Sequence, residues 1–341
     1  MKEAIDRVQR TRILAGYPLV LAFAALSAIS LETDQYLVWE VELNDSADAF
    51  NRYLNGEIET FLERQNARRD PTTSAEELTL QLYYYLFNGL HSSRLRHWLH
   101  TSPEVDRYPP NSVRYAEHLR MSVFNMRSFP FILPMSRTIR LGDVYLGIDK
   151  MGHFFGFGRR SFRHYLKLRE DGLIEGEAIE QTILRGYFME RYFVGNVMDG
   201  VFSYADLEAN FQGMVMARAF CEGEDAYFRR MNGKWVLTRP VDIRLFITPY
   251  FDESYNRSHY IGRRKRHVIR EIQEKVCPKL QSPLVQQRFE HYRQWPPSYC
   301  QQVVREHQER LGKDYRSEQD LEKLCDSLRQ AGQAGTDISS R

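Results

Sequence analysis

The chain has 341 residues, of which 43% are apolar and 27% are charged, and its formal net charge is +2. This length and balance are those of a globular protein with a large core, arranged as one large domain or two. The small net charge gives no reason to expect nucleic acid as a partner.

The N-terminus combines a basic stretch with an apolar one. Four basic residues precede the apolar residues 13–31 and four acidic residues follow them: Lys2, Arg7, Arg10 and Arg12 before, and Glu32, Asp34, Glu40 and Glu42 after. This asymmetry predicts that residues 1–31 are a secretory signal or a single membrane anchor. Ala28-Ile29-Ser30 would serve as a cleavage site, so both fit, and a buried core helix is the alternative. We expect a periplasmic location or one at the outer face of the cytoplasmic membrane.

Helical patterns dominate the chain after this segment. Residues 46–69 are predicted to form an amphipathic helix, and Ser74 with Glu77 forms a capping box that opens the next helix. A further helix is expected over 113–126, followed by a proline-interrupted, partly extended stretch over 129–146. Three more helices are predicted, over 149–169, 177–194 and 203–221. Together these segments form a predicted helical core, residues 45–222.

The pattern changes after Gly223. Residues 227–237 predict a β-hairpin around Asn232-Gly233, the one convincing sheet signal in the chain. Residues 241–251 are expected to add a strand, and helical patterns return from residue 262. Residues 223–331 therefore form a predicted hairpin plus helical, cysteine-containing region, and 332–341 a disordered tail. The predicted fold class is mainly α: a helical bundle with one small β-hairpin and a helical C-terminal region.

All four cysteines lie in the C-terminal part of the chain: Cys221, Cys277, Cys300 and Cys325. No Cys-x-x-Cys pair indicates zinc or a redox site. In an exported protein the four residues are consistent with two disulfides, for which three connectivities exist. Four free thiols are the alternative for a cytosolic protein.

Two predicted helices carry polar residues beside small ones on one face. At about 100° per residue, these faces are Asp149, Gly152, His153 and Gly156 on one helix, and Asp206, Asn210, Gly213 and Ala217 on the other. Small residues at four-residue intervals allow two helix backbones to approach closely. We therefore expect the polar side chains of the two faces to meet.

Glu190 lies on the helix between these two, at a position in its apolar stripe. A buried, unpaired carboxylate costs several kcal/mol. Glu190 is therefore expected to be paired, protonated, hydrogen-bonded or metal-bound, or to face a water-filled cleft. An ordinary ion pair with Arg185, Arg191 or Lys150 is the simplest alternative.

Asp149 and His153 have the spacing of two metal ligands, or of a carboxylate that orients an imidazole. With Glu190 and Asp206 they would hold one divalent metal, or His153 would act as a base with Glu190 as the acid. The simpler explanations are that Asp149 caps a helix, that Ser203 and Asp206 form a capping arrangement with Ser203 as the N-cap, and that His153 is a hydrogen-bonded core residue. Asn210 is disfavoured in mid-helix, which indicates that its amide is used inside the protein.

These residues occur in an order that resembles two bacterial envelope families. The order is Asp149-Lys150-x-x-His153-Phe154, then Glu190, then Asp206-x-x-x-Asn210-x-x-Gly213, and it is similar to the pattern of the VanZ-like family and of the YfiM-like periplasmic lipoproteins. The resemblance covers residues 149–213 and implies an envelope role, with VanZ-like members linked to glycopeptide-antibiotic tolerance. VanZ-like proteins cross the membrane several times and YfiM-like proteins begin with a lipidated cysteine, and this chain departs from both patterns.

Three functions fit these observations. In the first, Asp149, Lys150, His153, Glu190, Asp206 and Asn210 bind a polar or ionic ligand such as a lipid or cell-wall precursor head group, with Lys150 supplying charge for a phosphate. In the second, the same site is a metal-dependent or acid/base hydrolase. In the third, the cluster is a structural polar network. The basic residues 263–267 are a solvated helix start or a surface for anionic lipid head groups.

Overall fold

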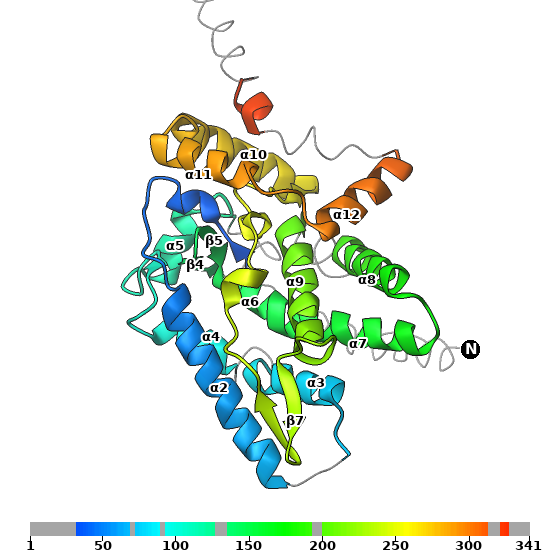
Figure 1. The fold of residues 1–341 in the computed structure, drawn as a ribbon. Coiled ribbons are helices and arrows are strands. Elements are labelled where there is room, and N and C mark those ends of the chain that lie inside the picture. The colour runs from blue at the N-terminus through cyan, green and yellow to red at the C-terminus, as the bar shows by residue number, and fades with distance from the viewer. Residues whose placement is uncertain are drawn as a thin grey trace, which may run out of the picture.

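A computed structural model describes residues 32–68, 72–88, 93–126, 135–192, 200–312 and 321–326. The predicted mainly helical fold is confirmed (Figure 1). The helices are α2 (Ala47–Arg68), α3 (Ala75–Leu86), α4 (Arg94–Thr101), α5 (Tyr115–Met121), α6 (Ile148–Gly152), α7 (Gly158–Glu170), α8 (Glu175–Met189), α9 (Tyr204–Cys221), α10 (Gly262–Lys275), α11 (Pro283–Arg293) and α12 (Tyr299–Arg310). Within these described ranges, no helix is long and apolar enough to span a membrane. The predicted signal or anchor, 1–31, and the predicted tail, 332–341, lie outside them.

Local capping signals set several of these boundaries as expected. Ser74 accepts a hydrogen bond from the backbone N–H of Glu77 at 3.2 Å, and Ser203 caps α9 through the N–H of Asp206 at 3.1 Å. The helix predicted over 113–126 is shorter, because the chain leaves helical geometry at Ser122, whose ψ is 154°. The sequence signal was therefore right about the helix and wrong about its end.

Helix α9 lies in the middle of the fold, among α3, α6, α7, α8 and α12 (Figure 1). Its side chains are buried on most sides, including Leu207, Met214 and Phe220. A helix that is apolar nearly all round belongs in the core of a protein. Polar residues on α9, such as Asp206 and Asn210, therefore have to find partners within the protein.

Glycines let α9 pack closely against the helix that follows β5. A Cβ atom at Gly213 would lie 1.9 Å from the carbonyl oxygen of Phe154, and one at Gly158 would lie 2.8 Å from Cα of Gly213. The close approach of α9 expected from Gly213 is confirmed. Its partner is Gly158, however, whereas Gly152 and Gly156, the expected partners, lie against Phe87. The reason is a π-helical turn, His153–Phe157, which separates α6 from α7 and rotates the following residues around the helix axis.

Short strands surround the helices at several places. The predicted hairpin is confirmed as β7 (Phe228–Met231) and β8 (Lys234–Leu237), with positive φ at Asn232 and Gly233. Beyond the one hairpin expected, there is a three-stranded sheet of β2 (Arg107–Tyr108), β4 (Thr138–Leu141) and β5 (Val144–Gly147), a parallel pair of β1 (Glu32–Thr33) and β3 (Met135–Ser136), and an antiparallel pair of β6 (Val201–Phe202) and β9 (His259–Tyr260).

The strand predicted over 241–251 was wrong. This segment forms two 3₁₀ turns, Ile243–Phe246 and Pro249–Phe251. Asp242 caps the first turn by accepting the N–H of Arg244, and Pro249 lacks the N–H that a strand would use. The segment that follows Phe251 enters the core and reaches the polar cluster described below.

The two predicted regions, 45–222 and 223–331, share one apolar core. The largest cluster of buried apolar side chains includes residues from both, for example Phe50 and Leu82 with Ile272 and Tyr292. It also includes Trp39, which is fully buried and precedes the predicted core. One disulfide joins Cys277 to Cys325, while Cys221 and Cys300 are free, so the chain has one of the two disulfides considered.

Candidate functional site

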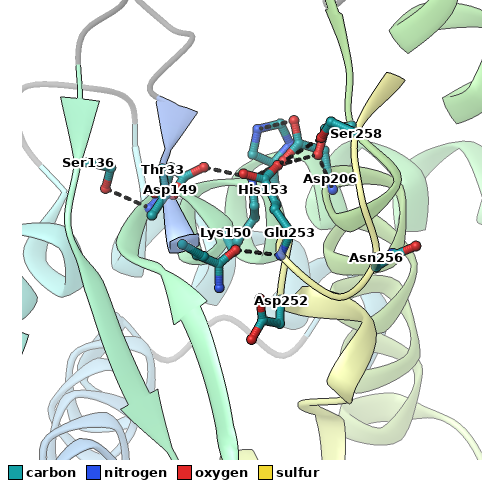
Figure 2. A network of polar contacts seen from close by, with 12 residues as sticks. Thr33, Ser136, Asp149, Lys150, His153, Asp206, Asp252, Glu253, Asn256 and Ser258 are labelled. Atoms are coloured by element: carbon teal, nitrogen blue, oxygen red, sulfur yellow. Dashed lines mark hydrogen bonds and ion pairs between the residues drawn. The ribbon is translucent and has the colours of Figure 1, made fainter. Parts of the chain in front are cut away.

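The ammonium group of Lys150 is at the centre of a buried polar cluster. Lys150 is 0% exposed, and its Nζ lies 2.8 Å from Asp149 Oδ2, 2.6 Å from Asp206 Oδ1 and 2.9 Å from Glu253 Oε1. Figure 2 shows these side chains converging between α6, α9 and the segment before β9. A lysine ammonium has three N–H donors, so three carboxylates satisfy it completely. We call Lys150, Asp149, Asp206 and Glu253 the Lys150 cluster.

The charges of the cluster shift one another's protonation. Burial by itself would lower the pKa of Lys150, but Asp149, Asp206 and Glu253 hold this pKa well above its ordinary value. Burial raises the pKa of Glu253 to about 7, and the charges of Asp206 and Asp149 add to this shift against the opposing effect of Lys150. Lys150 is therefore a permanent cation, and Glu253 is the carboxyl that exchanges its proton near neutral pH.

Several segments far apart in the sequence hold the Asp149 side of the cluster. The backbone N–H of Asp149 donates to Ser136 Oγ at 3.2 Å, and Thr33 Oγ1 donates to Asp149 Oδ1. Gln35 accepts the backbone N–H of Glu253 and donates to the carbonyl of Tyr145 at 2.8 Å. The cluster thus joins β1 and β3, the start of α6, and the segment after Phe251.

His153 continues the polar contacts from Asp206 toward the surface. Its Nε2 lies 3.2 Å from Asp206 Oδ2 and its Nδ1 lies 3.3 Å from Asn210 Oδ1. Burial by itself would raise the pKa of Asp206, but the charges of His153 and Lys150 and the hydrogen bonds from Lys150 and Ser203 hold it below its ordinary value. Both ring nitrogens of His153 therefore face side-chain oxygen atoms of α9.

Ser203 lies between Glu190 and the Lys150 cluster. Glu190 is 6% exposed, and its Oε1 accepts the backbone N–H of Ser203 at 3.1 Å. Ser203 Oγ in turn donates to Glu253 Oε1 at 2.6 Å. The structure therefore brings Asp149, Lys150, His153, Asp206 and Asn210 together as expected, and puts Glu253, rather than Glu190, beside Lys150.

This geometry differs from the metal site expected for Asp149, His153, Glu190 and Asp206. Among the described residues, no three His, Cys, Asp or Glu side chains are arranged to hold a metal ion. The position at which the carboxylates converge is filled by Lys150 Nζ, a positive charge built into the chain. The same contacts leave Lys150 without a free donor for a phosphate, which was its expected role.

The space beside Asn210 is small. A cavity of about 10 Å³ lies between α7, α8 and α9 and is lined by Asn210, Ser161 and Thr182 together with apolar side chains. This volume corresponds to roughly one water molecule. A head group of a lipid or a cell-wall precursor does not fit inside the helices here and would have to bind at the outer edge of the site.

Sequence reasoning missed Glu253 and Thr33. Both lie outside helices, in segments of the chain that show no periodic pattern: Thr33 in the two-residue strand β1, and Glu253 after a 3₁₀ turn. The sequence held only an indirect indication of these partners. A lysine on a buried helix face needs carboxylate partners, and Asp149 is the only carboxylate within four residues of Lys150 in the sequence. Glu253 could not be identified from the sequence, because it is more than 100 positions away from Lys150 and meets it only in the folded protein.

Comparisons with protein-family models, with curated proteins and with solved structures gave no match.

Proposed function

We propose that this chain is an exported bacterial envelope protein that binds a polar, anionic ligand at the outer edge of the Lys150 cluster, where His153 lies. The observation that carries the proposal is a gradient of exposure. The Lys150 side chain is 0% exposed, that of Asp206 is 8% and that of His153 is 12%. His153 is thus the member of the connected network through which a ligand would reach it.

The residues next to His153 favour an anion. The ring of Phe157 stacks on His153, with centroids 5.0 Å apart, and the guanidinium of Arg160 lies 4.8 Å from the Phe157 centroid. Arg160 is exposed, and no carboxylate of the described ranges pairs with it. In this proposal Arg160 supplies the charge and the amide N–H groups of Asn210 supply hydrogen bonds, while the adjacent His153 ring senses the bound anion.

The envelope location rests on two features of the chain. The basic and apolar N-terminal residues have the pattern of a signal or anchor, and Cys277–Cys325 is a disulfide of the kind that persists in oxidising compartments. A C-terminal fusion to alkaline phosphatase, which is active only outside the cytoplasm, tests this part. An inactive fusion in a bacterial host would contradict it.

The ligand site is tested by NMR of the His153 ring during titration with inorganic phosphate and with glycerol 3-phosphate, a lipid head-group fragment. We expect saturable shifts of the ring signals that Arg160→Gln weakens at least about tenfold, the loss typical of a charge-assisted contact. Lys167→Gln, which removes one charge from an exposed position on α7, should leave the titration unchanged. Absent shifts at His153, or equal losses in both variants, would refute the site.

One observation favours acid/base hydrolysis as a second function, namely the 3.2 Å pair between His153 and Asp206. Here Asp206 would hold Nε2 of a neutral His153 ring, and Nδ1 would accept a proton from a water molecule that replaces Asn210 Oδ1 beside it. Glu190, the expected general acid, instead accepts a hydrogen bond from the Ser203 backbone N–H. Turnover of p-nitrophenyl phosphate that His153→Gln abolishes would favour this function over binding, and no turnover would remove it.

A further inference from the structure

A second site lies away from the Lys150 cluster and is lined by side chains of α2, α3, α4 and α7, which Figure 1 labels. It is a cavity of about 770 Å³, within the range of small-molecule sites. Five arginines from three helices line it, together with one glutamate, Glu77: Arg64 and Arg68 from α2, Arg94 from α4, and Arg159 and Arg163 from α7. We call this the arginine cavity.

Most of this positive charge is not neutralised by the protein. Arg94 pairs with Glu57 at 3.6 Å, and Glu77 accepts a hydrogen bond from Gln81 at 3.0 Å. For the other four arginines, no carboxylate partner occurs in the part of the chain that the structure describes. Like charges held together without counterions attract a ligand with more than one negative charge.

Arg159 is the least exposed of the five arginines. Its Nε is buried and has no hydrogen-bond partner among the described atoms. Burial and the neighbouring charges of Arg163 and Arg160 also lower the pKa of Arg159. Because Nε is closed to solvent, an anion in the cavity would bind the terminal N–H groups of Arg159, and its negative charge would offset the repulsion among the arginines.

Tyrosine rings contact three of the five guanidinium groups. Arg159 lies 4.9 Å from the ring centroid of Tyr84, and Arg64 and Arg94 lie 5.4 and 4.7 Å from that of Tyr85. Stacking fixes the plane of a guanidinium and leaves the N–H groups at its edge for bidentate contacts. Tyr84 itself is 53% exposed, so a ligand can also contact an aromatic surface.

We propose that the arginine cavity binds a ligand that carries a phosphate or diphosphate group, with Arg159 and Arg64 among its contacts. Four unpaired guanidinium groups match a doubly charged phosphate better than a single carboxylate. The cavity is larger than a diphosphate, so there is room for the group to which it is attached. That group belongs to a soluble phosphoester or to a phospholipid, and the chemistry recognised is the same.

Isothermal titration calorimetry with inorganic pyrophosphate tests the proposal on the whole chain. We expect one site whose affinity falls at least tenfold in Arg159→Gln and in Arg64→Gln, each checked for an unchanged far-UV circular dichroism spectrum. Arg266→Gln removes the same charge from an exposed position on α10 and should not change the affinity. No binding at millimolar pyrophosphate, or an equal loss in Arg266→Gln, would overturn the proposal.

Flotation with vesicles separates the two sources of the phosphate group. Binding to phosphatidylglycerol vesicles that pyrophosphate displaces and Arg159→Gln weakens would assign the cavity to a lipid head group. Pyrophosphate binding without vesicle binding would assign it to a soluble phosphoester. Arg160→Gln tests the His153 edge separately, since Arg160 does not line the cavity, so either site can fail while the other stands.

Discussion

The Lys150 cluster and the arginine cavity are both built around cationic side chains, but they balance charge in opposite ways. Lys150 is 0% exposed and has three carboxylates within 2.9 Å of Nζ. The cavity is lined by five arginines and a single glutamate, and of these arginines only Arg94 has a carboxylate partner among the described residues. A fully paired buried charge fixes the positions of the segments that carry it, whereas unpaired charge at an open cavity is suited to a ligand.

The largest expected effect is on the paired charge. Lys150→Met would leave three buried carboxylates without their cation, and we expect a loss of about 3 to 5 kcal/mol in the free energy of unfolding. Lys167→Met on the exposed face of α7 serves as the control and should change stability by less than about 0.5 kcal/mol. Urea unfolding measures both. Similar stabilities for the two variants would show that the Lys150 cluster does not hold the fold together.

The next effect concerns the helix contact that brings His153 to Asp206 and Asn210. Gly213→Ala would put a methyl group 1.9 Å from the Phe154 carbonyl oxygen, so α9 must move, and we expect a loss of about 2 to 3 kcal/mol. Gly56→Ala, in the exposed middle of α2 with no atom within 4 Å of its Cβ, should instead stabilise by about 0.5 to 1 kcal/mol. Thermal unfolding compares them, and equal effects would contradict the close approach.

A smaller effect comes from Glu253 and depends on pH. Its pKa is about 7 in the folded protein and its ordinary value is 4.5, so the folded state holds the proton more tightly. Wild-type stability therefore contains a contribution that is present below about pH 4.5 and is lost as the pH rises through 7. Glu253→Gln removes this dependence, and its stability relative to the wild type should rise by on the order of 2 kcal/mol between pH 5 and pH 8.

The comparison with the wild type matters here because other groups titrate in the same range. Burial lowers the pKa of His100 and of His118 to about 4, and these groups make stability fall as the pH drops from 6.5. Both remain in Glu253→Gln, so their effects cancel in the difference between the two urea-unfolding curves. A difference that stays constant from pH 5 to pH 8 would show that Glu253 does not titrate near neutral pH.

The smallest effect on stability is expected in the arginine cavity. Arg159→Gln removes a buried donor without a partner and one of several repelling charges, at the cost of a stacking contact with Tyr84. We expect stability within about 0.5 kcal/mol of the wild type, or slightly above it, by thermal unfolding. A loss of several kcal/mol would mean that Arg159 is a structural residue like Lys150.

The two regions differ in how well the sequence predicted them, because the residues of one are related by short spacings along the chain and those of the other are not. The polar residues of α6 and α9 were recognised because helical periodicity and small residues are local signals, and they do converge. The arginine cavity was not recognised, since its arginines come from α2, α4 and α7 and share no spacing in the sequence. The resemblance to the VanZ-like and YfiM-like families stays a prediction.

By itself, the sequence determined the helical fold, the capped starts of α3 and α9, the hairpin at Asn232-Gly233 and the group of residues around His153. Caps, turns and helical faces depend on residues within a few positions of one another, so they can be read along the chain. Only the tertiary structure decided that Glu253 completes the shell around Lys150, that Gly158 meets Gly213, and that Lys150 is a buried ion-pair centre rather than a phosphate ligand. These outcomes depend on which distant segments fold against each other, because a buried charge is stabilised by whichever opposite charges reach it in space.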